Sequence, residues 1–346
     1  MNLLITGGGT GGHLSVAEAV AEQLHALGHC LYYLGAKAGQ EAHWFDDKPL
    51  FAQKLLLDVQ GIANKTACTL PRAALAQARA AREALSFLRA HQIERVFSVG
   101  GYAAAPACFA ALWARIPLYI HEQNAAVGLL NGILRPFCRE FYSSYLPDSP
   151  VRDYPLRARC FEGARVRESV RTVLFLGGSL GARTINDLAL RLAPLLLERG
   201  IAVIHQCGKR DFERVSAEYA AMGVQVELFD FSPNLIDAMR RADFAIARAG
   251  ASSLWELCAN GLPALFVPYP YAAKNHQFYN AEFLVKQNLA TMMCEDALED
   301  SAVMELVCDS TFVCERSARL GQVIAPNGAR AIALRIVEAE RGENER

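Results

Sequence analysis

The sequence predicts an α/β protein built from two similar domains, each a parallel β-sheet wrapped by helices. An apolar strand, a glycine-rich loop and a helix open the chain at residues 3–20, and the same series returns at 172–197. Strand-like and helical segments alternate after each opening, which is typical of helices that cover a parallel sheet. The length of 346 residues suits two such domains better than one.

The first loop has the pattern of a phosphate-binding turn. The apolar run Leu3–Ile5 predicts a buried strand, the glycine-rich stretch Gly7–Gly12 follows it, and a helical pattern begins at His13. Backbone N–H groups at the positive end of a helix can hold a phosphate, although a tight turn without a ligand gives the same pattern.

The glycine spacing also matches the dinucleotide fingerprint, but two features argue against the corresponding enzymes. The second strand, at 30–34, ends in Gly35-Ala36-Lys37 and lacks the acidic residue that holds the ribose of a nicotinamide dinucleotide. The loop also lacks the Gly-Lys-Ser/Thr ending of a P-loop. The sequence therefore argues against a dehydrogenase and against an ATPase.

Prolines and arginines interrupt the alternation at 151–168, which we interpret as a linker between an N-terminal domain at 1–150 and a C-terminal domain at 169–326. Further segments are expected in the first domain, namely a basic helix at 72–91 and strands at 95–99 and 118–121. In the second domain, strands are expected at 172–176, 202–205, 226–229, 244–247 and 264–267. No strand follows the last helix, at 327–342, so we expect it to cross back to the first domain. Two Rossmann-like halves of this kind are expected to face a ligand across a cleft.

Composition and charge narrow the class of protein. The net charge of −1 predicts no nucleic-acid partner. Ten scattered cysteines without a Cys-x-x-Cys pair favour a reducing cytoplasm over a disulfide framework or a zinc ribbon. No cleavable signal is expected, because Met1-Asn2 leads directly into the first strand. The longest apolar run, 103–114, is too short to span a bilayer, so we expect a soluble or peripheral protein.

Polar side chains gather where three predicted strands end. They lie at 121–124 (His-Glu-Gln-Asn), at Arg248–Glu256 and at Pro268–Gln277. An isolated Glu or Gln on such a loop is more often a solvated surface residue. Ligands of open α/β sheets bind at the carboxyl ends of the strands, however, so several such loops favour a shared ligand site.

Five motifs then appear in order along residues 1 to 290. They are Gly-Gly-Gly-Thr-Gly-Gly-His at 7–13, His-Glu-Gln-Asn at 121–124, Gly-Gly-Ser-x-Gly-Ala at 177–182, Arg-x-Gly-Ala at 248–251 with Glu256, and His276-Gln277 before Asn280-Ala281. By these motifs the chain resembles the MurG family, the peptidoglycan N-acetylglucosaminyltransferases that convert lipid I to lipid II. The resemblance implies a GT-B fold, UDP-N-acetylglucosamine as donor and the membrane-bound undecaprenyl-pyrophosphoryl-muramyl-pentapeptide, lipid I, as acceptor. It also implies no cofactor and a peripheral location at the cytoplasmic face of the cell membrane.

The resemblance assigns the donor to the C-terminal domain. The residues expected to hold its diphosphate, uracil, ribose and sugar are Ser179, Phe231, Ser232, Ala251, Ser252, Ser253, Leu254, Trp255, Glu256, His276 and Gln277. The residues expected to face the sugar and the acceptor from the first domain are Thr10, Gly11, Gly12, Tyr102 and Asn124. Arg157 best matches the family's linker arginine, although Tyr154 stands where the family's Asn-Pro-Val-Arg motif has asparagine. Leu180 likewise replaces the glutamine of the third motif.

The expected chemistry is a glycosyl transfer without a metal ion. Negative charge develops on the diphosphate as the glycosidic bond breaks, and the chain contains no Asp-x-Asp motif to hold a metal there. Fixed amide dipoles of the loop and helix start at 177–183 can stabilise that charge instead. The Glu256 carboxylate suits the ribose, because its two oxygens can accept hydrogen bonds from both ribose hydroxyls.

His13 is the expected general base. The positive end of a helix disfavours the imidazolium form, so the ring stays neutral and can take the acceptor's proton. A helix cap or a phosphate contact is the alternative role for His13, and Glu122 is the next candidate base.

The basic helix bears on the membrane. Arg72, Arg79, Arg82 and Arg89 fall on one helical face, which is either an ordinary solvated face or a contact with an anionic lipid surface. The apolar residues of 129–134 are expected to add to such a contact.

Two other functions fit parts of the pattern. A nucleotide-sugar epimerase of similar architecture would turn over UDP-N-acetylglucosamine without an acceptor. A nucleotide-sugar-binding scaffold of the cell-wall machinery would bind the donor without turnover.

Overall fold

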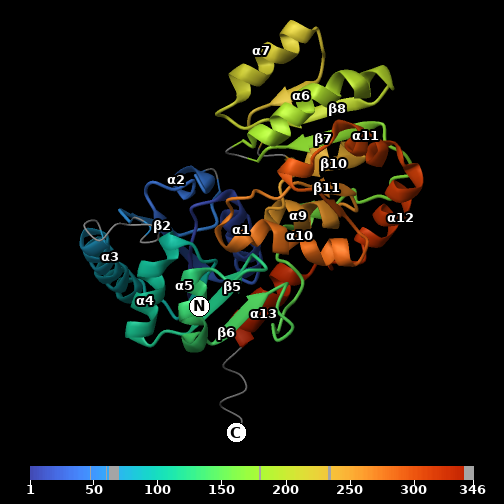
Figure 1. Ribbon diagram of the computed structural model, residues 1–346. Coiled ribbons are helices and arrows are strands. Elements are labelled where there is room, and N and C mark those ends of the chain that lie inside the picture. Colours follow the sequence, from blue (N-terminus) through green and yellow to red (C-terminus); the bar gives the residue numbers. More distant parts are fainter. Residues whose placement is uncertain (47, 60, 62–69, 179–180, 233–234, 339–346) are drawn as a thin grey trace. The chain divides into compact units, whose positions relative to one another are not determined.

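The computed structural model describes residues 1–46, 48–59, 61, 70–178, 181–232 and 235–338. The chain divides into two compact units (Figure 1). The first unit comprises Met1–Arg157 and Asn327–Arg346, and the second comprises Ala158–Pro326. No helix in the described part combines the length and apolar character needed to cross a membrane.

The first unit contains a parallel sheet of six strands in the order β3-β2-β1-β4-β5-β6. The strands are β1 (Asn2–Thr6), β2 (Cys30–Ala36), β3 (Gln53–Leu57), β4 (Arg95–Ser98), β5 (Leu118–Glu122) and β6 (Glu140–Ser143). In β1 the run Leu3–Ile5 is buried, and Leu4 is paired with Tyr32 on one side and Val96 on the other. A continuous apolar run suits this central position, because helices cover both faces of the sheet.

The helices of the first unit are α1 (Gly11–Ala26), α2 (Glu41–Trp44), α3 (Leu70–Ala90), α4 (Ala105–Ala114), α5 (Leu129–Leu134) and α13 (Gly328–Glu338), with short 3-10 turns η1 (Tyr102–Ala104) and η2 (Arg135–Phe137). Helix α13 packs on α1, and Arg335 pairs with Glu140 at 2.6 Å, so the last helix forms part of the first unit. A Cβ atom on Gly328 would lie 2.4 Å from the carbonyl oxygen of Asp153, so the close approach at the start of α13 requires glycine.

The second unit repeats the architecture with a six-stranded parallel sheet in the order β12-β11-β10-β7-β8-β9. Its strands are β7 (Thr172–Leu176), β8 (Ala202–Gln206), β9 (Glu227–Phe229), β10 (Phe244–Ala247), β11 (Ala264–Phe266) and β12 (Thr291–Met292). Its helices are α6 (Arg183–Glu198), α7 (Phe212–Met222), α8 (Leu235–Arg241), α9 (Ala251–Ala259), α10 (His276–Lys286), α11 (Asp300–Cys308) and α12 (Ser310–Leu320), with 3-10 turns η3 (Ala158–Cys160), η4 (Ala273–Asn275) and η5 (Glu295–Ala297).

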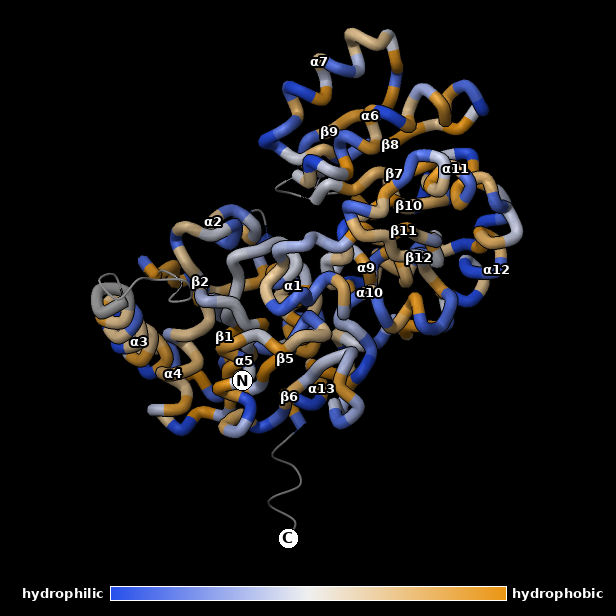
Figure 2. The backbone as a smooth tube through the Cα atoms, in the orientation of Figure 1, coloured by the Kyte–Doolittle hydropathy of each residue, from blue (hydrophilic) through white to orange (hydrophobic). Residues whose placement is uncertain are grey.

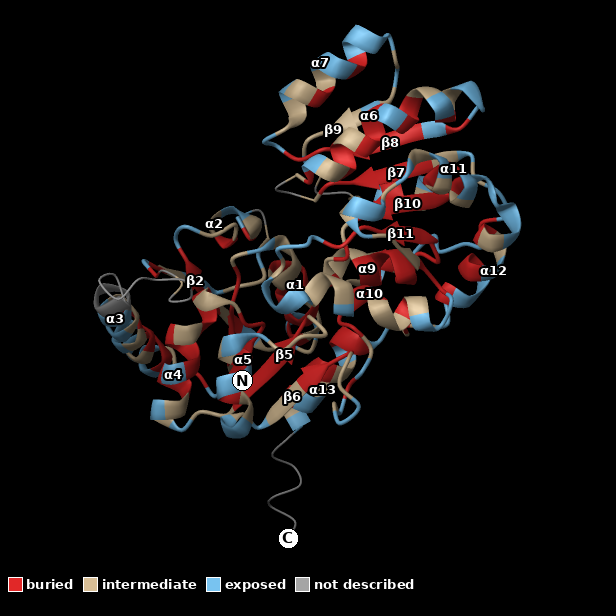
Figure 3. Cartoon of the chain, in the orientation of Figure 1, coloured by how far each residue is buried: buried red, intermediate tan, exposed pale blue. Residues whose placement is uncertain are grey.

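Both cores follow from the same pattern of burial. The central strands are buried along their length, whereas most of the helices bury one face and expose the other (Figure 3). The buried strands are also the hydrophobic ones (Figure 2). In α6, for example, Leu188, Leu192 and Leu196 are buried at helical spacing and pack against the strands. The predicted class of two doubly wound parallel sheets is therefore confirmed.

Each sheet has one point where the strand order reverses. In the first unit it lies between β1 and β4, and in the second between β7 and β10. In open α/β sheets a ligand binds outside the carboxyl ends of the strands at this point. The expected ligand-binding loops are therefore those after β1 and β4, and those after β7 and β10.

Candidate active site

Glycines at both ends of the loop after β7 lie close to the backbone at and just after the end of β8. The Gly177 N–H donates to the Gln206 carbonyl at 2.8 Å, which fixes the start of the loop. A Cβ atom on Gly181 would lie 2.8 Å from the Cys207 carbonyl oxygen, and the φ of this glycine is +82°, so the turn into α6 requires glycine. Apart from the adjacent residues, no described atom lies within 4 Å of a Cβ placed on Gly178. The predicted diphosphate contact Ser179 and its neighbour Leu180 lie outside the described residues.

The neighbouring loop after β10 leads into α9. Ser252 and Ser253 are half-buried in its first turn, and Glu256 follows one turn later with 7% of its surface exposed. Residues four apart share a helix face, so Ser252 and Glu256 lie on the same side of α9.

Two residues predicted to bind the donor have side chains that pack in the core of the second unit. Leu254 is fully buried, and the Trp255 ring stacks on Phe283 at 5.1 Å between ring centres. Their side chains pack in the core and help to position α9, and their contact with the donor stays a prediction.

Arg248, at the end of β10, joins two loops of the same edge. Its guanidinium donates to the Val267 carbonyl at 3.0 Å and the Pro268 carbonyl at 3.3 Å, and it pairs with Glu295. It also lies 5.5 Å from the centre of the Tyr269 ring. This arginine of the fourth motif therefore fixes the loop after β11 to the end of β10.

The loop after β11 presents two further predicted residues. His276 Nδ1 lies 2.9 Å from the Ala273 carbonyl oxygen, which only accepts, so the proton is on Nδ1 and Nε2 is left as an acceptor in the neutral ring. Gln277 Oε1 accepts from the Tyr269 N–H at 2.9 Å, which leaves the Gln277 amide group as a donor. Phe231 and Ser232 lie at the same edge, after β9.

A hydrogen-bond network around the buried Asn186 lies next to the loop after β7, and it was not predicted from the sequence. Asn186 of α6 donates to the Cys207 carbonyl at 3.0 Å and to Asp211 at 2.7 Å, and its amide oxygen lies 3.1 Å from His205 Nε2. Burial lowers the pKa of His205 to about 3, so the ring is neutral, donates from Nε2 and accepts from Tyr219 at 3.0 Å. No motif marks these residues; their positions on buried faces would have been the signal.

In the first unit, Thr10 and His13 form a pair at the start of α1. Thr10 Oγ1 lies 2.6 Å from His13 Nδ1, and both side chains reach solvent. If Nδ1 donates to the threonine hydroxyl, Nε2 carries a lone pair and can take a proton. Tyr102 lies beside the same loop, since a Cβ atom on Gly9 would be 3.3 Å from its ring.

Glu122 anchors the loop that follows β5. One oxygen accepts from the Asn124 N–H at 3.0 Å and from the Asn124 amide at 3.4 Å. The other accepts from the Gly128 N–H at 2.9 Å and from the Asn131 amide at 2.9 Å. Both oxygens of this buried carboxylate are occupied, which favours a positioning role for Glu122 over the predicted role as a base.

The preceding residue is a buried neutral histidine. Burial, together with the nearby His13, lowers the pKa of His121 to about 3. Its ring meets Tyr154 edge to face at 5.5 Å between centres. His121 is buried and stays neutral, whereas His13 reaches solvent.

Arg157 is held within the first unit by Glu18 of α1, at 3.2 Å. The same carboxylate accepts from Lys48 at 2.6 Å and from the Trp44 indole at 2.9 Å. Burial raises the pKa of Glu18, but the charges of Arg157 and Lys48 outweigh this and hold the pKa below its usual range. The predicted linker arginine is therefore paired with a protein carboxylate.

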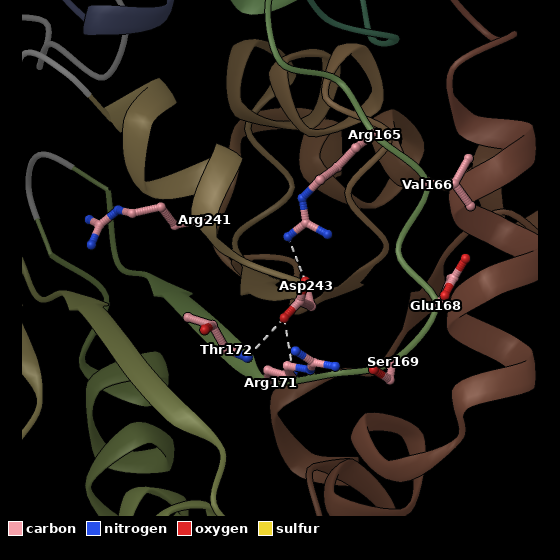
Figure 4. Close-up of a pocket in the computed structure, with 8 residues that line it drawn as sticks. All are labelled: Arg165, Val166, Glu168, Ser169, Arg171, Thr172, Arg241 and Asp243. Atoms are coloured by element: carbon pink, nitrogen blue, oxygen red, sulfur yellow. Dashed lines mark hydrogen bonds and ion pairs between the residues drawn. The ribbon is translucent and has the colours of Figure 1, made fainter.

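One hollow of about 360 Å³ lies away from these loops, at the amino end of β7 (Figure 4). Arg165 pairs there with Asp243 at 2.6 Å, and Asp243 accepts from the N–H groups of Arg171 and Thr172 at 2.9 and 3.0 Å. Arg241 pairs with Glu227 at 2.6 Å. These charges satisfy one another, and the hollow is at the end of the sheet opposite to the ligand-binding edge.

The chain matches two family models and several named proteins. The models are the glycosyltransferase family 28 N-terminal domain, over residues 3–143, and the glycosyltransferase family 28 C-terminal domain, over residues 172–316. A UDP-N-acetylglucosamine–N-acetylmuramyl-(pentapeptide) pyrophosphoryl-undecaprenol N-acetylglucosamine transferase from Wolinella succinogenes is 52% identical over 307 residues, 89% of this chain and 91% of that protein. The protein of the same name from Sulfurovum sp. is 44% identical over 333 residues, 96% of this chain and 97% of that protein.

Solved structures show the same fold. The crystal structure of Acinetobacter baumannii MurG aligns with a TM-score of 0.76 and 26% identity over 97% of this chain and 99% of that one. A UDP-N-acetylglucosamine 2-epimerase aligns with a TM-score of 0.64 at 12% identity over 100% of this chain and 96% of that one, a likeness of fold alone. The predicted GT-B class and the resemblance to the MurG family are confirmed. The chain belongs to glycosyltransferase family 28 and, within it, to the family of UDP-N-acetylglucosamine–N-acetylmuramyl-(pentapeptide) pyrophosphoryl-undecaprenol N-acetylglucosamine transferases.

Proposed function

We propose that this chain transfers N-acetylglucosamine from UDP-N-acetylglucosamine to the muramyl sugar of lipid I, giving lipid II for peptidoglycan synthesis. One observation carries the proposal. The second unit presents a glycine loop and helix α9 with Glu256 in its second turn, which suit a nucleotide diphosphate, and the first unit presents the Thr10–His13 pair, which suits proton abstraction.

The second unit holds the donor in this proposal. The N–H groups of the loop at 177–182 and the start of α6 meet the diphosphate, and Ser179 adds a hydroxyl. The start of α9, with Ala251, Ser252 and Ser253, faces the phosphates, while Glu256 accepts from both ribose hydroxyls.

The remaining donor contacts come from two other loops of the same edge. Phe231 and Ser232 flank the uracil. His276 offers an acceptor at Nε2 and Gln277 offers an amide donor, which together suit the hydroxyl groups of the sugar.

The reaction is a displacement with inversion. The acceptor hydroxyl oxygen attacks the anomeric carbon as the bond from that carbon to the diphosphate oxygen breaks, and UDP leaves with the bonding electron pair. Aligned amide dipoles stabilise the charge on the leaving group without reorganising. We expect the rate to survive chelation with EDTA, and a collapse of activity would contradict this account of the leaving group.

The first unit supplies the proton acceptor and the acceptor site. His13 takes the proton of the attacking hydroxyl at Nε2, while Thr10 holds the ring through Nδ1. Gly11, Gly12, Tyr102 and Asn124 line the acceptor side. Glu122 keeps Asn124 in place.

Arg157 keeps a place in the proposal as a contact of the diphosphate. Its Nη1 donates to Glu18, and in this proposal its remaining N–H groups meet the diphosphate.

The first unit also meets the membrane in this proposal. Large exposed apolar side chains are carried by the packed helices α3 and α4, by α5 and by the turn after it: Leu75, Phe109, Trp113, Leu129, Ile133 and Phe137. Arg79, Arg82 and Arg89 are exposed on α3, while the side chain of Arg72 lies outside the described residues. Apolar side chains next to cations suit an anionic lipid surface, which each basic residue favours by ~1 kcal/mol. We place this surface at the cytoplasmic face, in line with the ten scattered cysteines.

A vesicle assay tests the membrane contact. Replacing Phe109 and Trp113 together by Gln should reduce sedimentation with phosphatidylglycerol vesicles, and high salt should reduce it further. Turnover of a water-soluble acceptor analogue should survive. The matched control is Met222→Gln, the same kind of change at an exposed site of the second unit. Unchanged binding of the double variant at low salt would show that the membrane contact lies elsewhere.

A further inference from the structure

The glycine loop of the first unit is occupied by a carboxylate of the chain itself. Glu41, the first residue of α2, has only 1% of its surface exposed. Its Oε2 accepts from the Gly9 N–H at 3.0 Å, and its Oε1 accepts from the Ala36 N–H at 3.0 Å. One N–H of the predicted phosphate-binding loop is thus already bound to an anion.

Three glycines make room for this carboxyl group. A Cβ atom on Gly8 would lie 2.7 Å from the Glu41 carboxyl carbon, and one on Gly35 would lie 2.8 Å from the Tyr33 ring and 3.0 Å from Glu41 Cγ. A Cβ atom on Gly39 would overlap the carboxylate oxygens. Glu41, with Tyr33 at Gly35, therefore accounts for these glycines without a ligand.

The loop after β4 packs closely against the first glycine loop. A Cβ atom on Gly7 would lie 2.6 Å from the Gly100 carbonyl oxygen, and one on Gly101 would lie 2.5 Å from the Gly8 carbonyl oxygen. The loops after β1 and β4 therefore pack backbone against backbone at the point where the strand order reverses.

The second unit differs at the equivalent point. Apart from the adjacent residues, no described atom lies within 4 Å of a Cβ placed on Gly178, after β7, or on Gly250, after β10. Among the described residues, a carboxylate side chain therefore lies against the first glycine loop, and no side chain of a non-adjacent residue lies within 4 Å of a Cβ placed on Gly178 or Gly250.

The charge of Glu41 acts on its surroundings. Burial and the Glu41 carboxylate raise the pKa of Tyr102, and they raise the pKa of Tyr33 well above its usual range. The Tyr33 hydroxyl donates to the Gly7 carbonyl at 2.5 Å, so this tyrosine also holds the loop.

We propose that the Glu41 carboxylate is a built-in anion that fills the phosphate position of the first glycine loop, excludes a nucleotide diphosphate from the first unit and positions Thr10 and His13. It is a positioning and specificity-determining residue. Its effect on turnover rests on the proposed function, because the loop that Glu41 holds through Gly9 continues directly into Thr10.

A binding experiment tests the exclusion independently of catalysis. Inorganic phosphate is titrated by calorimetry into protein saturated with UDP, so that the second unit is occupied. Wild-type protein should take up no phosphate, whereas Glu41→Ala should bind one phosphate per chain. Glu198→Ala, which removes an exposed carboxylate of the second unit, is the control and should behave as wild type. If the folded Glu41→Ala protein binds no phosphate, the position is not a phosphate site and the inference fails.

A kinetic experiment tests the positioning. A displacement of His13 by about 1 Å is expected to lower the turnover of Glu41→Ala by about 100-fold. Its affinity for UDP should be unchanged. Inorganic phosphate or formate should restore turnover in a saturable way, without activating wild type. The inference would be overturned if Glu41→Ala turned over at the wild-type rate. It would also be overturned if neither phosphate nor formate restored the lost turnover.

Glu41→Gln keeps the test decisive if Glu41→Ala fails to fold. The amide has the same size but presents an N–H₂ group to the N–H of Gly9 or Ala36. We expect reduced turnover that anions do not restore, because the position remains filled. Full turnover in Glu41→Gln would show that the charge is not needed. If wild type itself made no disaccharide, the proposed function would fail while the phosphate titration still decided the inference.

Discussion

Replacing Glu122 by Gln separates anchoring of the loop after β5 from proton transfer. Each carboxylate oxygen accepts two hydrogen bonds, from Asn124 on one side and from Gly128 and Asn131 on the other. Gln keeps one oxygen and turns an N–H₂ group toward two donors. An unsatisfied buried donor costs about 1–3 kcal/mol, and the bond at 3.4 Å counts least, so the variant should lose about 2–4 kcal/mol.

Calorimetric unfolding and steady-state kinetics measure the two effects. The melting temperature of the first unit should fall by roughly 5–15 °C. The acceptor KM should rise because Asn124 is released, while kcat should fall less than 10-fold. The fall of kcat at acidic pH should remain as in wild type. Glu122→Asp, which keeps the charge but shortens the side chain, is the matched control. The reasoning would be refuted if Glu122→Gln were fully stable, its kcat fell about 1000-fold and kcat no longer fell at acidic pH. Glu122 would then be the base.

His13→Ala should lower kcat and kcat/KM together by about 10²–10⁴-fold with UDP affinity retained; a raised acceptor KM alone would make His13 a binding residue. Glu256→Ala should weaken UDP binding by about 1.5–3 kcal/mol, and unchanged affinity in calorimetry would remove Glu256 from the site. Below pH ~6.5 the unfolded chain protonates His121 and His205, whereas both stay neutral in the native state down to a pKa of about 3. The free energy of unfolding should therefore be highest above pH ~6.5 and fall toward pH 3 by ~1.4 kcal/mol per pH unit for each histidine. If urea titrations gave the same free energy of unfolding at pH 7 and pH 5, the two rings would not be buried and neutral.

The central strands could be predicted because their signal is local. The strands at 172–176 and 244–247 are apolar runs buried on both faces, and loops rich in glycine or polar residues mark their ends. The strands β3, β6 and β12 were missed. β3 exposes Gln53 and Lys54, and β6 begins with Glu140, which pairs with Arg335 of the last helix, a residue distant in the sequence. β12 has two residues, too few for any periodicity.

The candidate site was predicted where motifs mark loops, but the direction of a side chain depends on distant partners. The sequence does not show that Phe283 stacks on the ring of Trp255. It also does not show that Glu18 pairs with Arg157. Glu41 carries no motif at all, and its role depends on the close approach of glycines from separate segments. Sequence spacing cannot give such long-range contacts.

The transfer itself tests the central claim most directly. The protein is incubated with labelled UDP-N-acetylglucosamine, with and without a lipid I analogue, and the products are separated. We predict UDP release and a labelled disaccharide on the analogue only when the analogue is present. Conversion of the donor without the analogue would indicate an epimerase, and donor binding without any turnover would indicate a scaffold; either result would contradict the account.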